Sequence, residues 1–293
     1  MTTSLLTHMR HGGAAAMDSR SHPEQFVITP RHGWRSVDLA ELWRYRDVIY
    51  FLVWRDFKVR YRQTLLGAAW AAIQPLLTVA IFPFLFSRLA GLSSDGVPYP
   101  LFALAAFIPW GFFSAGAGNA TNCMNTNQDL VKRIYFPRLA IPLATILSGL
   151  PDLLVGLGLL AGFFLYYGVT PGPAALLLPL FLLQGFIATV GFGIILAAAN
   201  ARFRDVGHAV PFLLQVALLA TPVGYASSVI PEPWRLLYAL NPMVGVIDGV
   251  RMALFGAPLA LDTALVSLAT TLVALVGGTI YFSTIERNLA DIL

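Results

Sequence analysis

The sequence predicts an all-α, polytopic membrane protein, and three observations lead to this fold class. Hydrophobic residues make up 57% of the 293 residues, whereas Asp, Glu, Lys and Arg make up only 12%. That charged share is about half of the ~25% usual in soluble domains, and the mean hydropathy is +0.70. Long stretches contain no charged residue at all: 63–87, 96–128, 153–201, 206–231 and 263–285. A soluble fold would lack polar surface at this composition, and intrinsic disorder is excluded by the same numbers.

The beginning of the chain is its polar part, with ten of the 19 Lys and Arg residues before position 63. Residues 1–30 are expected to form a flexible cytoplasmic tail, because Gly12 and Gly13 lie among scattered Arg, His and Ser. No apolar core of 7–15 residues precedes the first charges, so a secretory signal is not expected. The first apolar span must then direct membrane insertion itself.

Residues 31–62 are expected to form an amphipathic cytoplasmic interface segment. From position 36, apolar or aromatic residues recur at helical spacing: 39, 42, 43, 49, 50, 53, 54, 57 and 61. Ser36 is a suitable N-cap and Asp38 falls in the first turn, beside the positive helix end. With Trp43 and Trp54 on the apolar face, the pattern favours a helix lying along the inner membrane surface. Such a helix serves either as a juxtamembrane anchor or as a docking surface for a cytoplasmic partner.

Six apolar segments are long enough to cross the hydrocarbon core, which takes about 20 helical residues. The transmembrane domain covers 63–293, with spans expected at about 66–89, 99–124, 139–166, 174–199, 206–227 and 262–283. Before the last span, residues 229–255 contain Pro231, Pro233 and Pro242 and are too broken and too charged for a seventh crossing. We expect two short re-entrant helices there, on the outer side, covered by protein or by a water-filled cavity.

Basic residues set the expected orientation. With the N-terminus inside, 16 of the 19 Lys and Arg residues fall on the cytoplasmic side, and the outer side keeps Arg88, Arg235 and Arg251. The positive-inside rule therefore predicts six spans with both termini in the cytoplasm. If 229–255 crossed the membrane, the C-terminus would lie outside.

Few ionisable residues fall in the apolar segments, although such residues usually mark the pathway of a secondary transporter. Asp152 lies inside the third span and is expected either to pair with a neighbouring helix or to face a polar cavity. Asp248 and Arg251 lie three residues apart, so they can pair on one helix face. Because no relay of Asp, Glu and His is visible, proton coupling is disfavoured.

The chain lacks the residues for nucleotide hydrolysis. A phosphate-binding loop needs a lysine directly after a glycine, but the two lysines, Lys58 and Lys132, follow Phe57 and Val131. The single Cys123 excludes an internal disulfide, and outside the N-terminal tail only His208 remains, so no metal site is expected. We therefore expect neither catalytic activity nor a cofactor in this chain, and any ATPase must be a separate protein.

Four blocks of sequence carry a resemblance to a known family. The first block consists of PRHGW at 30–34 and YFLVWRDFKVRYRQT at 50–64, followed by LG, WA and QP at 66–67, 70–71 and 74–75. The second is NQDLVKRIYFPR at 127–138, the third is NPM at 241–243, and the fourth is ERNLADI at 286–292. Together they resemble the membrane subunit of ABC type-2 polysaccharide exporters, which move O-antigen, capsule or teichoic acid chains. The resemblance covers roughly residues 28–293.

The resemblance implies a permease that acts as a homodimer in the bacterial inner membrane with two copies of a cytoplasmic ATPase, which would bind ATP and Mg. The substrate would be a lipid-linked glycan, which passes through a channel lined by aromatic residues. The permease would also contact membrane lipids. It implies an interface helix that includes Asp38, Glu41, Leu42, Trp43 and Arg44. It also implies a coupling helix at about 126–134, with the ATPase-coupling residues Asn127, Gln128, Asp129, Leu130, Val131, Lys132 and Arg133. The charges of that helix are equally explained as positive-inside residues.

Two further groups of residues are candidates for contact with the substrate. A neutral sugar chain needs aromatic faces and hydrogen-bonding groups, so the glycan path is assigned to Trp110, Phe112, Phe113, Asn119, Asn122 and Tyr225. Packing and interhelical amide hydrogen bonds explain the residues of the second span equally well, and Tyr225 also suits an interfacial belt. A lipid pyrophosphate or anionic head groups would attract Arg55, Lys58, Arg60 and Arg62, although these residues also serve as orientation charge.

Other functions are weaker readings of the same sequence. An ABC type-2 permease for small drugs or lipids shares the topology, but the first two blocks favour polysaccharide. A membrane enzyme needs a carboxylate pair or a metal cluster at the membrane edge, and the loops 90–98 and 167–173 offer only Asp95. No basic nucleic-acid motif accompanies the positive charge, so nucleic acid is not expected as a partner.

Overall fold

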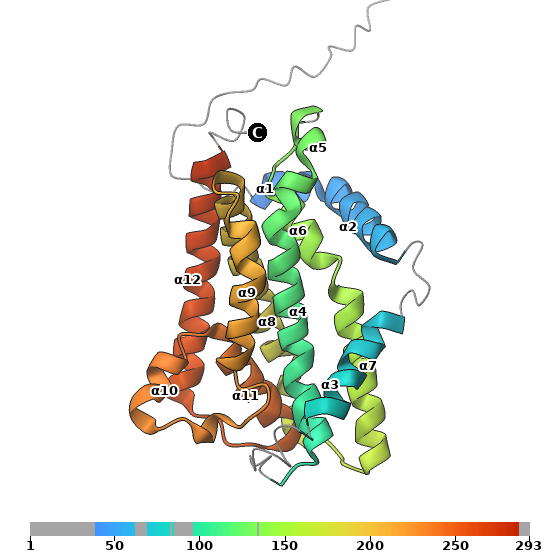
Figure 1. Ribbon diagram of the computed structural model, residues 1–293, viewed down its shortest axis with the longest axis vertical. Helices are drawn as coiled ribbons and strands as arrows, with labels where there is room; N and C mark the ends of the chain where they lie inside the picture. The colour runs from blue at the N-terminus through green and yellow to red at the C-terminus, as the bar shows by residue number, and fades with distance from the viewer. Residues whose placement is uncertain (1–38, 62–68, 83, 85–95, 134, 287–293) are drawn as a thin grey trace, which may run out of the picture. The chain divides into compact units, whose positions relative to one another are not determined.

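The computed structural model describes residues 39–61, 69–82, 84, 96–133 and 135–286 (Figure 1). Within these ranges the regular elements are all helices, which confirms the all-α class. They are α1 (Leu39–Arg44), α2 (Arg46–Tyr61), α3 (Ala69–Phe82), α4 (Tyr99–Thr126), α5 (Gln128–Arg133), α6 (Ala140–Leu147), α7 (Leu150–Tyr167), the 3₁₀ helix η2 (Pro173–Leu177), α8 (Leu178–Arg202), α9 (Val206–Leu219), the 3₁₀ helix η3 (Ser227–Val229), α10 (Glu232–Tyr238), α11 (Pro242–Phe255) and α12 (Leu261–Glu286). The tail expected at 1–30 lies outside the described residues, as do Asp38 and Arg62.

Four of the described segments are long and apolar enough to cross a membrane. They are Tyr99–Thr126, Ala140–Tyr167, Pro173–Arg202 and Leu261–Glu286, and they match the spans expected at 99–124, 139–166, 174–199 and 262–283. Each segment has more than 20 apolar or nearly uncharged residues, the length that a hydrocarbon core requires. The segment Ala140–Tyr167 consists of two consecutive helices, α6 and α7, which meet at Ser148 and Gly149.

The other two expected spans are shorter helices in the structure. The helices α3 and α9 have 14 residues each, about 21 Å at 1.5 Å per residue, against a hydrocarbon core of ~30 Å. For the span expected at 66–89, residues 69–82 and 84 are described. For the span expected at 206–227, the helix ends at Leu219, eight residues early. Pro222 explains this end, because proline removes a backbone donor and disfavours helical backbone at Thr221 before it.

The helix α8 lies at the centre of the bundle, between α4 and α12. Two glycines allow the close approach of α8 and α12. A Cβ atom on Gly191 would lie 2.7 Å from the backbone nitrogen of Leu275, and one on Gly278 would lie 2.8 Å from the carbonyl oxygen of Gly191. Small residues at such contacts let membrane helices pack backbone to backbone.

The helical bundle has two opposite ends, which we name by the helices that lie there (Figure 1). We call the "α5 end" the one where α1, α2 and α5 gather with the last turns of α8 and α12. We call the "α10 end" the opposite one, with α10, α11 and the first turn of α4. Long α4 runs from one to the other.

Two short helices do occupy the segment expected to be re-entrant. The second, α11, begins where the Asn241 side chain accepts a hydrogen bond from the Met243 N–H, and ends at Gly256, whose φ of 69° suits glycine. It is buried along most of its length against α4, α8 and α12. Insertion of α10 and α11 into the outer leaflet stays a prediction.

Candidate functional site

The helix α2 is apolar on two sides. One row of side chains, which includes Ile49, Leu52 and Val53, packs against the hydrophobic core formed with α4, α6 and α8. Another row is exposed: Tyr50, Phe51 and Trp54, together with Trp43 from α1. An aromatic row left open beside a packed row suits a helix on a membrane surface. Of the residues predicted for the interface helix, Glu41 and Leu42 are half-buried, and Trp43 and Arg44 are exposed.

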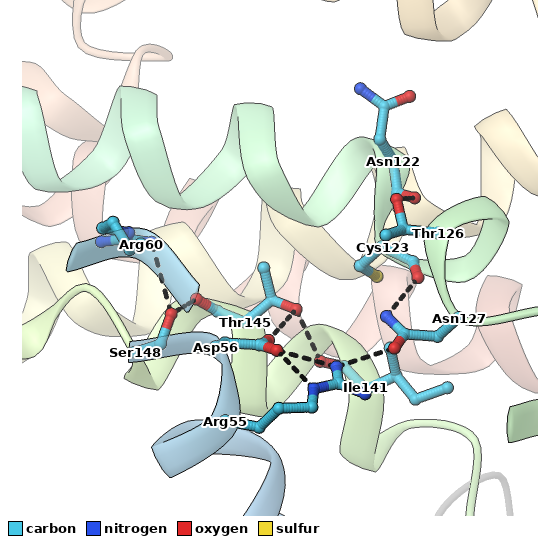
Figure 2. A network of polar contacts seen from close by, with 10 residues as sticks. All are labelled: Arg55, Asp56, Arg60, Asn122, Cys123, Thr126, Asn127, Ile141, Thr145 and Ser148. Carbon is cyan, nitrogen blue, oxygen red and sulfur yellow. Dashed lines mark hydrogen bonds and ion pairs between the residues drawn. The ribbon is translucent and has the colours of Figure 1, made fainter. Parts of the chain in front are cut away.

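A polar network joins α2 to the junction of α4 and α5 and to α6 (Figure 2). The Arg55 guanidinium donates to Asp56 Oδ1 at 2.7 and 3.0 Å and to Asn127 Oδ1 at 2.7 Å. The Thr145 hydroxyl, on α6, lies 3.5 Å from Asp56 Oδ2. The Arg55 and Asp56 side chains are both partly buried, so the charge-assisted hydrogen bonds hold three separate segments together in surroundings of reduced dielectric.

Asn127 is the anchor of α5. Its buried side chain donates from Nδ2 to the Cys123 carbonyl at 2.8 Å, and its backbone N–H donates to the same carbonyl at 3.1 Å, so Asn127 closes the end of α4 twice. Its Oδ1 accepts from Arg55. The following helix has no buried residue, and Asp129, Lys132 and Arg133 are exposed on it. The predicted coupling helix is therefore a short helix that is held to the bundle by Asn127 before it and by Leu130 and Val131 against the core, with its charged side chains exposed.

A second polar cluster joins α2 to α7. Arg60 Nη1 lies 2.6 Å from Asp152 Oδ2, and Arg60 Nη2 donates to Ser148 Oγ at 3.3 Å. The Tyr61 hydroxyl donates to the other oxygen of Asp152. Burial and that hydrogen bond raise the pKa of Tyr61 to about 12, so the phenol stays a donor at neutral pH. Asp152 thus pairs with a neighbouring helix, one of the two settings expected for it.

The four predicted basic residues of the α2 region do not act alike. Arg55 and Arg60 turn inward to carboxylates. Lys58 is exposed, and its Nζ lies 5.1 Å from the centre of the Trp54 ring, a cation–π distance. Arg62 lies outside the described residues.

A cavity of about 290 Å³ opens beside the second cluster. Helices α2, α3, α4, α6 and α7 line it, and its polar residues are Arg60, Tyr61, Gln74, Asn119, Thr145 and Asp152. Trp70, Phe107, Ile108 and Leu153 supply apolar surface. Asp152 therefore also faces a polar cavity, the other setting expected for it. Within the described ranges, no three His, Cys, Asp or Glu side chains are close enough to hold a metal ion.

The predicted glycan-path residues of α4 fall on opposite faces. Trp110, Phe112 and Phe113 are 3%, 9% and 6% exposed and pack in the interior of the chain, as the packing alternative expects. Asn119 and Asn122 are exposed, in a row we call the "α4 stripe": Gly111, Ser114, Ala115, Gly118, Asn119, Asn122, Asn125 and Thr126. Every member of the α4 stripe is small, hydroxylated or an amide, and none is charged. Tyr225 is half-buried, with its hydroxyl donating to the Leu219 carbonyl at 3.1 Å and lying 2.9 Å from the Tyr238 hydroxyl.

Comparison with known proteins identifies the family of this helical bundle. A family model described as ABC-2 type transporter matches residues 47–255, which include both polar clusters. The chain belongs to this family. Its permeases are membrane subunits that normally work with a separate ATPase.

Individual permeases are similar over nearly their whole length. The O-antigen export system permease protein RfbA of Myxococcus xanthus is 30% identical over 240 residues, which cover 81% of this chain and 91% of that protein. A protein of the same name from Klebsiella pneumoniae is 27% identical, covering 84% and 95%. The polysialic acid transport protein KpsM of Escherichia coli is 25% identical, covering 80% and 91%.

Several residues of this permease that join the helices carried no signal on their own. Thr145 and Ser148 lie inside an apolar span, and Asp56 lies in a basic run where it reads as solvent-exposed charge. Asn200, at the end of α8, is buried, donates to the Thr121 carbonyl and Asn122 Oδ1 at 2.9 and 3.1 Å, and accepts from the Gly207 N–H at 2.7 Å. For Asn200, the sequence offers one signal: an amide side chain near the end of the charge-free stretch 153–201.

Proposed function

We propose that this permease moves a lipid-linked, O-antigen-like polysaccharide across the bacterial inner membrane. It would work as a homodimer with two copies of a cytoplasmic ATPase that binds ATP and Mg, and both of its termini would be cytoplasmic. Membership of the ABC-2 family and the similarity to permeases named for O-antigen and polysialic acid support this proposal.

The α4 stripe is the observation that carries the proposal within the molecule. An exposed face of a membrane helix is normally apolar, because lipid cannot satisfy amides or hydroxyls. The α4 stripe runs from Gly111 to Thr126, about 22 Å along the helix at 1.5 Å per residue. Its uncharged amides and hydroxyls match the hydroxyls of a sugar chain, and a second copy facing it would enclose a hydrated passage.

The two polar clusters suggest how ATP hydrolysis in the partner would reach the membrane. The exposed charges of α5 would bind the ATPase. Motion of α5 would pass through Asn127 and Arg55 to α2, and through Arg60 and Asp152 to α7. Because these contacts are short and charge-assisted, α2 would follow α5 rather than slide past it.

The lipid end of the substrate would meet the outward side of α2. Exposed Lys58 beside Trp54 offers a positive charge at the membrane interface, which suits a pyrophosphate or an anionic head group. Arg55 and Arg60 would have to leave their carboxylates to take part. The proposal for lipid pyrophosphate contact therefore rests first on Lys58 and, outside the described residues, on Arg62.

Deletion of the gene for this permease, with complementation, tests the proposed function. We expect loss of surface polysaccharide and retention of lipid-linked glycan inside the cell. The wild-type permease should restore export. A variant with Ala115→Phe and Asn119→Leu, which narrows the α4 stripe and removes one amide, should restore less than a tenth of it.

A matched control is Thr284→Leu, a loss of an exposed hydroxyl on α12 away from the α4 stripe. It should export normally. Normal surface polysaccharide in the deletion strain would exclude the proposal. If that strain instead showed altered drug susceptibility or lipid distribution, a permease for small drugs or lipids would take its place.

A further inference from the structure

A second cavity, of about 520 Å³, lies at the α10 end, apart from the polar clusters of the α5 end. It is bounded by the start of α4, η3, α10, α11 and the segment 256–260. The side chains of its wall are mixed in chemistry: Phe102, Ser227, Arg235, Tyr238, Asp248 and Phe255. Its volume falls within the ~300–1,000 Å³ typical of small-molecule sites.

The position of Arg251, at the inner wall of this cavity, is fixed by the backbone. The side chain is 3% exposed, and its Nη1 and Nη2 donate to the carbonyls of Tyr225 and Val223, each at 3.1 Å. The guanidinium carbon lies 3.6 Å from the centre of the Phe102 ring. Arg251 therefore satisfies carbonyls of the bend after α9 and holds that wall in place, so the cavity is preformed.

The hydrogen-bonding groups of the wall keep capacity for a ligand. Asp248 accepts from the Ser227 hydroxyl through Oδ1 at 2.7 Å, and in the described part of the chain no hydrogen bond to its Oδ2 is found. Because Tyr225 donates to the Leu219 carbonyl, Tyr238 must donate to Tyr225, and this leaves the Tyr238 oxygen able to accept.

The chemistry of the wall selects among classes of ligand. A hydrocarbon tail would leave the Asp248 carboxylate with the Ser227 hydroxyl alone and its Oδ2 desolvated, at a cost of about 1–3 kcal/mol. Asp248 would repel a bound anion, and Arg235 and Arg251 would repel a bound cation. A pyranose meets none of these conflicts, since its hydroxyls donate to the carboxylate and the phenol oxygen while its C–H face packs on Phe255 or Tyr238.

We propose that the cavity at the α10 end is a subsite for a neutral pyranose unit of the exported glycan. This inference rests on the proposed function and adds to it a place where each protomer holds the sugar chain as it leaves. Such a hold would oppose backward movement of the glycan between cycles of the ATPase.

The test is sugar binding by the full-length permease in lipid nanodiscs. Saturation-transfer NMR is recorded with a panel of methyl glycopyranosides of glucose, galactose, mannose, rhamnose and N-acetylglucosamine. At least one should receive saturation from the wild-type permease and lose at least fivefold in Asp248→Asn. Ser228→Trp, at an exposed position on the cavity rim, should abolish the signal without a change in the buried groups, so it serves if Asp248→Asn fails to fold.

Glu232→Gln is the matched control, because Glu232 is an 87% exposed carboxylate on the neighbouring α10 and lies outside the cavity wall. It should bind as the wild type does. No signal from any glycoside, equal signals in Ser228→Trp, or preferential binding of methyl glucuronide or inorganic phosphate would each overturn the subsite.

Complementation separates this inference from the proposed function. In the deletion strain, Ser228→Trp should restore markedly less surface glycan than Glu232→Gln. If the strain lacks surface glycan and Ser228→Trp restores it fully, the subsite fails and glycan export stands. If deletion leaves the surface glycan intact, glycan export itself fails.

Discussion

Arg55 and Arg60 at the α5 end of this permease make different contacts from Arg251 at the α10 end. At the α5 end, Arg60 joins α2 to α7 through the Asp152 carboxylate, and Arg55, paired with Asp56 on its own helix, joins α2 to Asn127. At the α10 end, Arg251 binds backbone carbonyls of a bend, beside a cavity. The difference indicates separate tasks. Polar contacts between helices hold separate helices together, whereas an arginine on backbone carbonyls gives irregular backbone a fixed shape.

The largest effect is expected at the α10 end, for Arg251→Met. This change leaves the buried carbonyls of Val223 and Tyr225 without their donor, so we expect a loss of about 3 kcal/mol or more in stability. Thermal unfolding of the purified permease measures it. Arg235→Met, at a much more exposed arginine of the same end, is the control and should cost under about 1 kcal/mol. If the two variants lost the same stability, Arg251 would have no special role in fixing the bend after α9.

The next effect is expected on the exposed charges of the α5 end. Reversal of two charges, Lys132→Glu with Arg133→Glu, should leave thermal stability within about 0.5 kcal/mol, because neither side chain is buried. Copurification of the ATPase and glycan export should fall at least tenfold, since like charges at an interface cost several kcal/mol. Arg202→Glu with Arg204→Glu, exposed at the start of another loop of the same end, is a control for nonspecific charge effects. Intact assembly and export with Lys132→Glu and Arg133→Glu would show that α5 does not couple.

A smaller effect is expected for Asn127→Ala, which removes the anchor of α5 but none of its exposed charges. Loss of the hydrogen bonds to Arg55 and Cys123 should cost about 1–2 kcal/mol. Export per ATP hydrolysed should fall severalfold while the ATPase still copurifies. Gln128→Ala, one residue on, should leave both values near those of the wild type. If copurification of the ATPase fell instead of export per ATP hydrolysed, Asn127 would belong to the surface that binds the ATPase.

The smallest effect is expected from a double-mutant cycle on Arg60 and Asp152. With Arg60→Met and Asp152→Asn, the coupling energy should be about 1 kcal/mol, because both side chains are only partly buried. The cycle on Arg46 and Asp47, which lie 3.9 Å apart and are mostly exposed, should give nearly zero. A coupling near zero for Arg60 and Asp152 would mean that this contact holds α2 and α7 no more firmly than a surface pair.

The hydrophobicity of successive residues was enough to predict the long membrane spans, which depend on local sequence alone. The four long spans follow from apolar runs of more than 20 residues with at most one charged residue inside each, whereas the helix at 128–133 was expected only from the family resemblance. The end of α9 at Leu219 was not predicted, although the sequence shows Pro222, which explains it. The bend depends on carbonyls satisfied by Arg251, which lies 26 and 28 residues further along the chain.

Partners far away in the sequence explain what was missed in the candidate site. Arg55 and Arg60 lie in a basic run and read as surface charge, but Asn127 and Asp152 lie 72 and 92 residues away from them. Periodicity within α2 cannot show such pairs. The aromatic residues of α4 illustrate the same limit, because a stack lining a passage and a packed core have the same helical spacing.

The single helix α4 reaches both of these ends. Its 28 residues extend about 42 Å, with Phe102 under the Arg251 guanidinium near one end and Asn127 bound to Arg55 at the other. If the partner ATPase moves α2, as proposed, Arg55 and Asn127 would pass that movement to α4, and α4 would carry it to Phe102, with Pro109 as the position where the helix bends most easily. Under the proposed mechanism, binding of the ATPase at one end and opening at the other would then depend on the same movement of α4, and replacement of Pro109 would make that movement more rigid.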